Sequence, residues 1–283
     1  MVAETLTIRP ADVGGGRVRY TIASLVTEPA QHAELRASFE AGGFRSPDCE
    51  YTIIDNSHGN VGCAYRGLNR LLAEARGAYV VLCHQDVRLL ADGRERLDTL
   101  LAELETRDPD WAVAGNAGGY GIGSLAIRIS DPHGADQRVG TLPARVRTLD
   151  ENFIIVRRSA RTGFSNDLTG FHFYGADICL AADVMGYSSY VIDFHLQHLS
   201  PGRKDVSFYE AERRFVAKWG HALRPRWMQT TCSLVHVSGS RLGDFIANLA
   251  SRPLAGLMRR LPIRTIWTGN WPLGEARTGR VPR

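Results

Sequence analysis

Residues 77–90, Gly-Ala-Tyr-Val-Val-Leu-Cys-His-Gln-Asp-Val-Arg-Leu-Leu, are the stretch of this 283-residue chain that decides its fold. The five residues from Tyr79 to Cys83 form an unbroken apolar run, which predicts a strand buried on both faces, as in a parallel sheet. Ligands of open α/β sheets collect just beyond the carboxyl ends of such strands. His84-Gln85-Asp86 therefore marks a candidate site for a hydrated divalent cation. A plain turn cap at Asp86 is the equally open alternative.

The composition is that of an ordinary globular protein, with 44% hydrophobic and 23% charged residues. The first ten residues contain no apolar segment typical of a signal peptide, and no apolar run approaches the roughly 20 residues that span a bilayer. The five cysteines show no CxxC spacing. We therefore expect reduced cysteines and a cytoplasmic protein.

The charge is unevenly distributed along the chain. Residues 240–283 contain eight arginines and two acidic residues and therefore carry a net charge of +6. The whole chain carries +4, so the net charge of residues 1–239 is −2. The nearly neutral body argues against a nucleic-acid surface, whereas the basic tail favours an anionic lipid or another partner. We expect one domain over 1–239 and a basic, partly amphipathic extension over 240–283.

Strand and helix patterns alternate at the start of the chain. Strands are expected at 18–27, 51–55 and 79–83, with helices at 31–41 and 63–76. This β-α-β-α-β order predicts an α/β fold with a mostly parallel, doubly wound central sheet flanked by helices.

The rest of the chain is less regular. Asp92 is expected to cap a helix over 93–106. The glycine-rich stretch 118–123 lacks the spacing of a dinucleotide fingerprint and is expected to be a flexible loop, and residues 124–150 give no clear pattern. Further elements are expected as strands at 111–115, 152–156 and 187–194, with the last ending at 195–198, and as helices at about 176–185 and 206–219.

Polar residues follow several of these strands, at ends that one sheet edge would bring together. Asp55 and Asn56 could accept hydrogen bonds from a nucleobase or ribose, or form a simple Asx turn. Asn60, Gly62 and Asn69 flank a helix start, where backbone N–H groups favour anions, although each alone also fits an ordinary loop or helix surface.

Two acid–base candidates lie further along. Asp177 opens a helix, where it could take a proton from an acceptor hydroxyl or merely interact with the helix dipole. His195 and His198 point to opposite faces of a strand, so at most one should bind a metal, and His198, nearer the loop, is the candidate.

Over about residues 18–200, the order of these segments resembles the family-2 glycosyltransferases of the GT-A fold. The segments that carry the resemblance are Val26-Thr27-Glu28, Ile54-Asp55-Asn56-Ser57, Asn60-Val-Gly62, Leu68-Asn69, Gly77–Val87, Trp111–Gly115, Phe171–Leu180 and Val191–His198.

The resemblance implies transfer of a sugar from a UDP- or GDP-sugar to a glycan or lipid-linked hydroxyl, in cell-envelope or glycan biosynthesis. It implies an inverting, hexosyltransferase-type reaction aided by Mn²⁺ or Mg²⁺. Asp86 matches the last acid of the family's D-x-D signature, His84 replaces its first acid in a His-Gln-Asp variant, and His198 matches a later metal-binding histidine. The donor would be bound by Thr27, Glu28, Asp55, Asn56, Asn60, Gly62, Asn69 and Gln85.

The catalytic base is less well matched. Asp177 lies in the segment that usually supplies the base, but Tyr174-Gly175 stands where the family's acidic pair is expected. His172 and Asp150 are the other candidates. A non-catalytic sugar-nucleotide or glycan-binding module with the same fold is the alternative function.

The basic tail has two interpretations. Leu242, Phe245, Ile246 and Leu249 have helical spacing, as do four apolar residues between 254 and 261. Such a helix could pack on the sheet domain or join copies of the chain into a homo-oligomer. It could instead lie at the inner face of a membrane, as a peripheral contact near a lipid-linked acceptor.

Overall fold

The computed structural model describes residues 18–202, 204–250 and 253. The chain divides into two compact units, residues 1–216 and 217–283, with the boundary inside helix α5 (Val206–Ala222).

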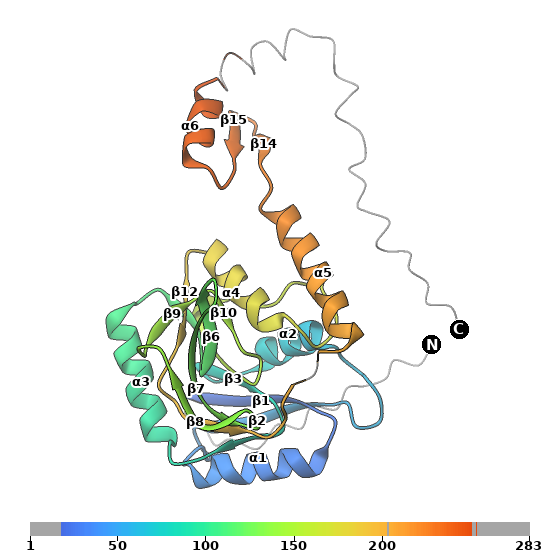
Figure 1. The fold of residues 1–283 in the computed structure, drawn as a ribbon, viewed down its shortest axis with the longest axis vertical. Helices are drawn as coiled ribbons and strands as arrows, with labels where there is room; N and C mark the ends of the chain where they lie inside the picture. The colour runs from blue at the N-terminus through green and yellow to red at the C-terminus, as the bar shows by residue number, and fades with distance from the viewer. Residues whose placement is uncertain (1–17, 203, 251–252, 254–283) are drawn as a thin grey trace, which may run out of the picture. The chain divides into compact units, whose positions relative to one another are not determined.

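The first unit is built on a seven-stranded sheet (Figure 1). Five of its strands run in one direction, and β11 and β9 run against them. The expected mostly parallel α/β sheet is therefore confirmed. Its spatial order is β2 (Cys49–Asp55), β1 (Tyr20–Val26), β3 (Tyr79–Cys83), β11 (Phe153–Arg157), β5 (Trp111–Gly115), β12 (Ser188–Val191) and β9 (Ala144–Val146).

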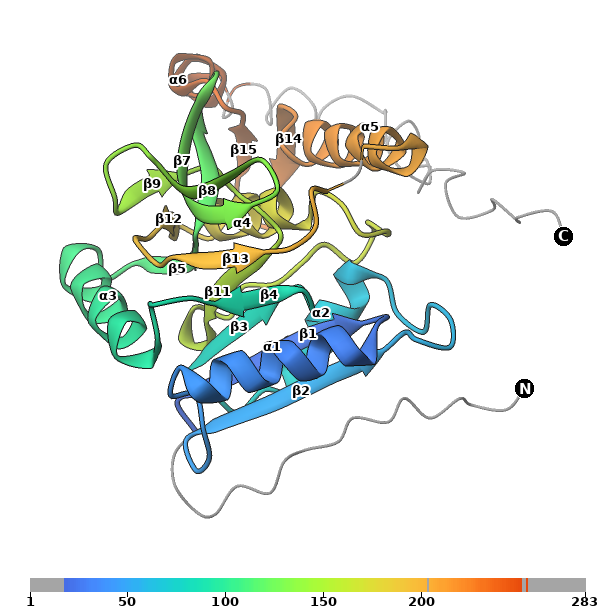
Figure 2. The same ribbon diagram turned by 60° about the horizontal axis from the view of Figure 1, so that its bottom comes forward.

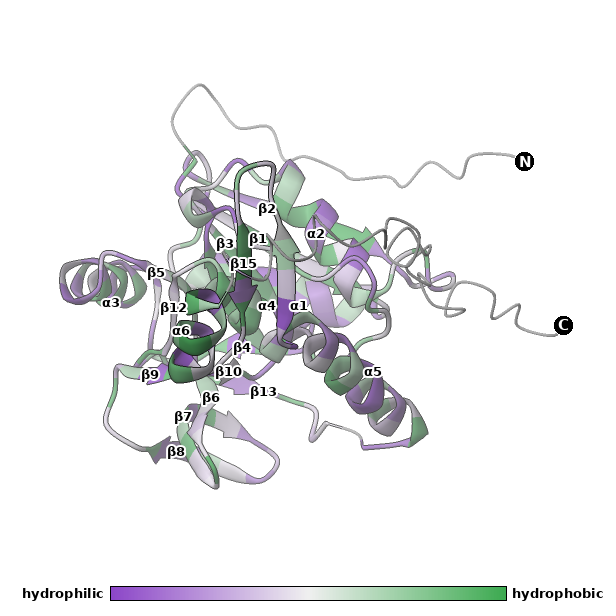
Figure 3. Cartoon of the chain, turned by 90° about the horizontal axis from the view of Figure 1, so that it is seen from above, coloured by the Kyte–Doolittle hydropathy of each residue, from purple (hydrophilic) through white to green (hydrophobic). Residues whose placement is uncertain are grey.

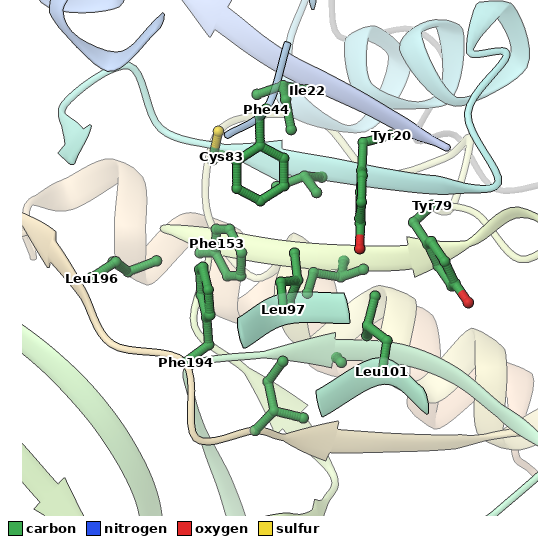
Figure 4. Close-up of a cluster of buried hydrophobic side chains, with 14 of the residues drawn as sticks. Tyr20, Ile22, Phe44, Tyr79, Cys83, Leu97, Leu101, Phe153, Phe194 and Leu196 are labelled. Atoms are coloured by element: carbon green, nitrogen blue, oxygen red, sulfur yellow. The ribbon is translucent and has the colours of Figure 1, made fainter. Parts of the chain in front are cut away.

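Helices cover both faces of this sheet, as the positions of α1 and α2 in Figure 2 illustrate. Helices α1 (Pro29–Ala41) and α3 (Arg94–Arg107) contribute to one buried cluster, and α2 (Ala64–Glu74) and α4 (Tyr174–Val184) to the other. Figure 4 shows part of the first cluster. Along β3, Tyr79, Val81 and Cys83 join the first cluster, while Val80 and Leu82 join the second. The apolar run is thus continuous because both faces of its strand are covered.

A second sheet lies in the same unit and was not predicted. Its order is β10 (Thr148–Leu149), β6 (Ala117–Gly121), β7 (Ser124–Asp131), β13 (Leu196–His198) and β4 (Val87–Leu89), with β8 (Gly134–Val139) paired to β7. Strand β4 begins directly after His84-Gln85-Asp86 and pairs antiparallel with β13, so that His198 lies opposite Val87. This pairing joins the end of β3 to a segment more than 100 residues later.

Three local expectations were wrong. The glycine-rich stretch is strand β6 rather than a loop, and a Cβ at Gly118 would lie 2.2 Å from the carbonyl oxygen of Thr148 on the paired strand. Glycine therefore permits close strand pairing here. The strand expected at 187–194 ends at Val191, and 196–198 forms a separate strand in the second sheet.

The third error concerns Asp92. Helix α3 begins after Gly93, with no side-chain cap. Asp92 Oδ2 instead accepts a hydrogen bond from the backbone N–H of His195, at 2.7 Å. The carboxylate therefore fixes the chain just before β13.

The described part of the second unit contains a hairpin, β14 (Arg226–Gln229) and β15 (Leu234–Val237), followed by α6 (Arg241–Leu249). Ser240 caps α6 by accepting a hydrogen bond from the N–H of Gly243. His236 Nδ1 lies 2.8 Å from Asp244, which ties the helix to the hairpin.

Helix α6 presents apolar side chains that its own unit does not bury, and much of it is coloured as hydrophobic in Figure 3. Leu242, Phe245, Ile246 and Leu249 are each at least 59% exposed. The apolar positions expected between 254 and 261 lie outside the described residues. Within the described chain, no helix combines the length and apolar character needed to cross a membrane.

Candidate functional site

A cleft of about 610 Å³ opens beyond the carboxyl ends of β1, β2 and β3. This is the edge at which parallel α/β sheets bind ligands, and the volume lies within the usual range for small-molecule sites. Its lining combines apolar strand residues with polar residues of the following loops. The lining residues are Leu25, Thr27, Glu28, Gln31, Asn56, Leu68, Leu82, Cys83, His84, Gln85, Asp86, Phe171, Tyr174 and Ser200.

Three potential metal ligands meet beside this cleft. His84 Nδ1 lies 3.3 Å from His198 Nε2, and His198 Nε2 lies 3.4 Å from Asp86 Oδ1. The ligand atoms of all three residues lie within 4.8 Å of one another. The β4–β13 pairing accounts for this geometry, because it sets the strand that carries His198 against the strand that follows Asp86. Two imidazoles and a carboxylate form a donor set that suits a divalent cation.

The protonation states favour metal binding. Burial, followed by the charge of neighbouring His198, lowers the pKa of His84, so its ring is neutral at physiological pH. Burial alone would raise the pKa of Asp86, but hydrogen bonds with His198 and Ser200 outweigh it and hold that pKa well below its usual range. A neutral imidazole and an ionised carboxylate are the forms that bind metals.

Tyr174, the first residue of α4, connects the cluster to the helix. Its hydroxyl lies 2.8 Å from His84 Nε2 and donates to the backbone carbonyl of Glu151, at 3.0 Å. The Tyr174 ring is buried and packs edge-on against Tyr65 and Phe164. The buried Tyr174 side chain therefore fixes the orientation of the His84 ring through the nitrogen that faces away from His198.

Gln85 joins two of the loops that line the cleft. Its Oε1 accepts hydrogen bonds from the backbone N–H groups of Thr27 and Glu28, at 2.8 and 2.9 Å, and its Nε2 donates to Thr27 Oγ1. The amide expected to bind the donor thus holds the β1–α1 loop against the end of β3. Thr27 and Glu28 themselves are exposed in the cleft.

Other predicted donor-binding residues also organise loops. Asn56 lines the cleft and bridges its own loop by hydrogen bonds to the backbone of Val61 and Gly62. Asn69 does not line the cleft, and its amide exchanges two hydrogen bonds with the backbone of Phe164.

Two more predicted contacts lie outside the cleft lining. Asp55 accepts hydrogen bonds from the backbone and hydroxyl of Ser57, which is the Asx turn considered as its alternative. Asn60 is exposed on the same loop.

The expected catalytic residues lie around the start of α4 and do not line the cleft. Asp177 is fully buried, and its two oxygens accept hydrogen bonds from the backbone N–H and hydroxyl of Ser165, each at 2.7 Å. His172 is partly exposed, with Nε2 3.4 Å from Ser207 Oγ. Asp150 is exposed and contributes to the electrostatic environment of His84.

Sequence reasoning missed three residues of the site. Tyr174 was noted only as a departure from a motif, and no local pattern connects it to His84, which lies 90 residues earlier in the chain. Ser200, two residues after His198, donates its backbone N–H to Asp86 at 3.1 Å. Glu151 lies where burial, then the charge of Asp150, raises the pKa of its carboxyl to about 8.

No family model matches the chain. A solved structure with a similar fold is S. aureus TarS 1–349 in complex with UDP-GlcNAc, with a TM-score of 0.50 and 13% identity. That match covers 71% of this chain and 66% of TarS 1–349, just under two thirds of its length. The mannosyltransferase PcManGT from Pyrobaculum calidifontis in complex with GDP-Man and Mn²⁺ aligns with a TM-score of 0.47 and 16% identity, covering 76% of this chain and 68% of that one.

The structural likeness concerns the fold, which is an α/β fold similar to that of GT-A glycosyltransferases. A sequence relative is "ATP synthase subunits region ORF 6" from Fuscovulum blasticum, 37% identical over 206 residues. The alignment covers 71% of this chain and 83% of the relative. The protein therefore belongs to the same family as ORF 6 of the ATP synthase subunits region of F. blasticum.

Proposed function

We propose that this protein is a glycosyltransferase that moves a sugar from a UDP- or GDP-sugar to a hydroxyl of a glycan or lipid-linked acceptor, with inversion and with the help of a divalent cation. The observation that carries the proposal is the convergence of His84, Asp86 and His198 beside a cleft at the carboxyl edge of a parallel sheet. The similar fold of S. aureus TarS, which was solved in complex with UDP-GlcNAc, supports the proposal.

The cation site would be formed by His84, Asp86 and His198. A divalent cation bound there would neutralise the charge that builds on the departing nucleoside diphosphate. The chain itself would place the donor, because Gln85 holds the Thr27–Glu28 segment at the cleft wall and Asn56 holds the neighbouring loop. Ser200 contributes by orienting the Asp86 carboxylate through its backbone N–H.

For the proton of the acceptor hydroxyl we propose two residues with different roles. His172 is partly exposed, so its imidazole would accept the proton directly. To act as a base, Asp177 would first have to break its hydrogen bonds with Ser165. With these bonds intact, its role would be to hold the 162–165 loop in place. Replacing a direct general base should lower the rate by about 10²–10⁴-fold.

The proposal is tested by incubating the full chain with UDP- and GDP-sugars and Mn²⁺, and by measuring release of UDP or GDP. We expect metal-dependent release that Asp86→Ala abolishes, with the thermal unfolding profile of the variant retained. Metal-independent turnover, or turnover unaffected by Asp86→Ala, would refute the metal role. His172→Gln and Asp177→Asn, compared side by side, identify the base by the size of the rate loss.

The enclosed Asp177 favours one alternative, a sugar-nucleotide or glycan-binding module without catalysis. The same assay distinguishes the two functions. Nucleotide-dependent stabilisation of the protein without release of UDP or GDP from any donor would indicate the module.

We also propose that α6 and the arginine-rich segment after it form a peripheral contact with the cytoplasmic face of a membrane. The exposed apolar residues Leu242, Phe245 and Leu249 support this, together with the +6 charge of residues 240–283. Flotation with anionic liposomes should retain the full chain, and Phe245→Glu should weaken its binding. Equal flotation of both proteins, or flotation of neither, would refute this contact.

A further inference from the structure

We infer that Tyr174 is a positioning residue for the metal ligand His84, and that the resulting set of two imidazoles and one carboxylate makes the site selective for transition-metal dications over Mg²⁺. This inference rests on the cation site of the proposed function. It goes further by naming the class of cation and the residue that prepares the site.

The hydrogen-bond geometry indicates which nitrogen of His84 faces the metal. The Tyr174 hydroxyl donates its proton to the carbonyl of Glu151, at 3.0 Å, so at His84 Nε2, 2.8 Å away, the same oxygen can only accept. Nε2 must then carry the hydrogen, and the lone pair of the neutral ring is on Nδ1. Nδ1 is the nitrogen that faces His198 Nε2. Tyr174 therefore holds His84 in its ligand form before any metal arrives.

The spacing of the donor atoms fits an ion held between them. Two ligands of one ion, each bound at about 2.1 Å, stand roughly 3.0–3.4 Å apart. The separations of His198 Nε2 from His84 Nδ1 and from Asp86 Oδ1 are 3.3 and 3.4 Å. Three ligands leave further positions on the ion for oxygens of a diphosphate.

The chemistry of the donors gives the selectivity. Mg²⁺ prefers oxygen ligands in near-ideal octahedral geometry and keeps much of its water. Imidazole nitrogens suit transition metals, and a facial set of two histidines and one carboxylate is characteristic of such ions. Here His84 supplies a nitrogen ligand where a second carboxylate would have supplied oxygen. The exchange therefore lowers the affinity of the site for Mg²⁺ more than its affinity for Mn²⁺, Co²⁺ or Zn²⁺.

The Tyr174 hydroxyl can be removed without removing its ring. The ring is 5% exposed and lies edge-on to Tyr65 and Phe164, with centroids 6.5 and 5.9 Å away. Tyr174→Phe keeps this packing and deletes the hydroxyl that accepts from His84 Nε2–H and donates to the Glu151 carbonyl. Tyr51→Phe is a matched control, because Tyr51 is also buried and donates its hydroxyl to a backbone carbonyl, that of Phe44, at 2.8 Å.

The experiment measures metal binding by the full chain without any nucleotide. Calorimetric titration with Mg²⁺, Mn²⁺ and Co²⁺ gives the dissociation constants, and the visible absorption of bound Co²⁺ reports nitrogen ligation. We expect Mn²⁺ and Co²⁺ to bind at least tenfold more tightly than Mg²⁺. Tyr174→Phe should weaken Co²⁺ binding by about 10–100-fold, as loss of an outer-shell partner does. Tyr51→Phe should leave it unchanged.

His84→Asp provides the complementary test, since it should reduce the preference for Co²⁺ over Mg²⁺ at least tenfold. Equal affinity of the wild-type protein for Mg²⁺ and Mn²⁺, or wild-type Co²⁺ binding by Tyr174→Phe, would overturn the inference. Failure of the proposed function has a different signature: selective metal binding without any turnover of a sugar nucleotide. Turnover supported equally by Mg²⁺ and Mn²⁺ would instead refute the selectivity alone.

Discussion

Replacing Glu151 by Gln is expected to make the stability of the protein less sensitive to pH. Burial, reinforced by the charge of Asp150, raises the pKa of the Glu151 carboxyl from 4.5 to about 8. In the unfolded chain the same carboxyl loses its proton near its ordinary pKa. Between these two values the folded protein therefore holds a proton that the unfolded chain has released. Stability must fall as pH rises through this window, and the fall ends above about 8.

The size of the effect follows from the shift. One pH unit inside the window changes the free energy of unfolding by at most about 1.4 kcal/mol. From pH 6 to pH 8 the loss is at most about 3 kcal/mol, and partial solvation of the side chain reduces it to about 1–3 kcal/mol. For a unit of this size, that corresponds to a change of about 3–10 °C in Tm.

The assay is thermal unfolding of the wild-type protein and Glu151→Gln at pH 6 and pH 8. The difference in Tm, variant minus wild type, should be about 3–10 °C larger at pH 8 than at pH 6. Glu50→Gln is the control, because Glu50 is buried but its pKa is lowered by hydrogen bonds to Thr21 and Arg76 against the effect of burial. Its contribution is complete above about pH 5, so that variant should lose the same stability at both pH values. A Glu151→Gln difference that is equal at pH 6 and pH 8 would refute the reasoning.

Three further substitutions test the supports of the site. Gly118→Ala should lower the free energy of unfolding in urea by about 2 kcal/mol or more, because the new Cβ would lie 2.2 Å from the Thr148 carbonyl oxygen. A loss below about 0.5 kcal/mol would show that the two strands move apart freely. Asn69→Ala should cost about 1–3 kcal/mol in the same assay, since it leaves the backbone of Phe164 without both of its partners, and an unchanged midpoint would contradict this role. Gln85→Ala should weaken UDP or GDP binding several-fold in calorimetric titration, with Tm retained within a few degrees; unchanged affinity would mean that the loop it holds does not contact the nucleotide.

The central sheet could be predicted from the sequence because its signals are local. The run from Tyr79 to Cys83 needs both faces buried, and the structure buries all five side chains to 7% exposure or less. The alternating strands and helices before it predicted a parallel arrangement, and β1 indeed pairs in parallel with both β2 and β3. The strand bounds moved by only a few residues.

The second sheet could not be predicted in this way. Strands β4, β10 and β13 have only two or three residues, and every residue of β6 and β8 is exposed or half-buried, so these strands carry no apolar run. Glycines at 118 and 119 looked like a loop, but they serve close strand pairing with β10. The partner of such a strand is decided by tertiary contacts, which no local pattern contains.

At the candidate site, the sequence predicted which residues lie at the sheet edge better than it predicted what their side chains do there. His84, Asp86 and His198 were identified as ligands from their positions at strand ends, and they lie together. Gln85 and Asn69 were expected to bind the donor from the resemblance to family-2 glycosyltransferases. In the structure the Gln85 amide hydrogen-bonds to the backbone of the β1–α1 loop, and the Asn69 amide hydrogen-bonds to the backbone of Phe164. Sequence position brings a residue to the site, but only the surrounding backbone decides whether its side chain is free to bind a ligand.

Because β13 is held by its pairing with β4, the position of one ligand of the cation site, His198, depends on the second sheet. Asp86 lies in the short connection between β3 of the central sheet and β4 of the second sheet, whereas His198 belongs to a three-residue strand of the second sheet alone. Asp92 anchors the chain at His195, just before that strand, through a single 2.7 Å hydrogen bond. Loss of this anchor should therefore displace His198 more than Asp86. Asp92→Ala is expected to weaken Co²⁺ binding while the central sheet unfolds at nearly the same temperature, because the contact lies outside both buried clusters. Parallel losses of Co²⁺ affinity and Tm would instead show that the two sheets hold the ligands as one rigid body.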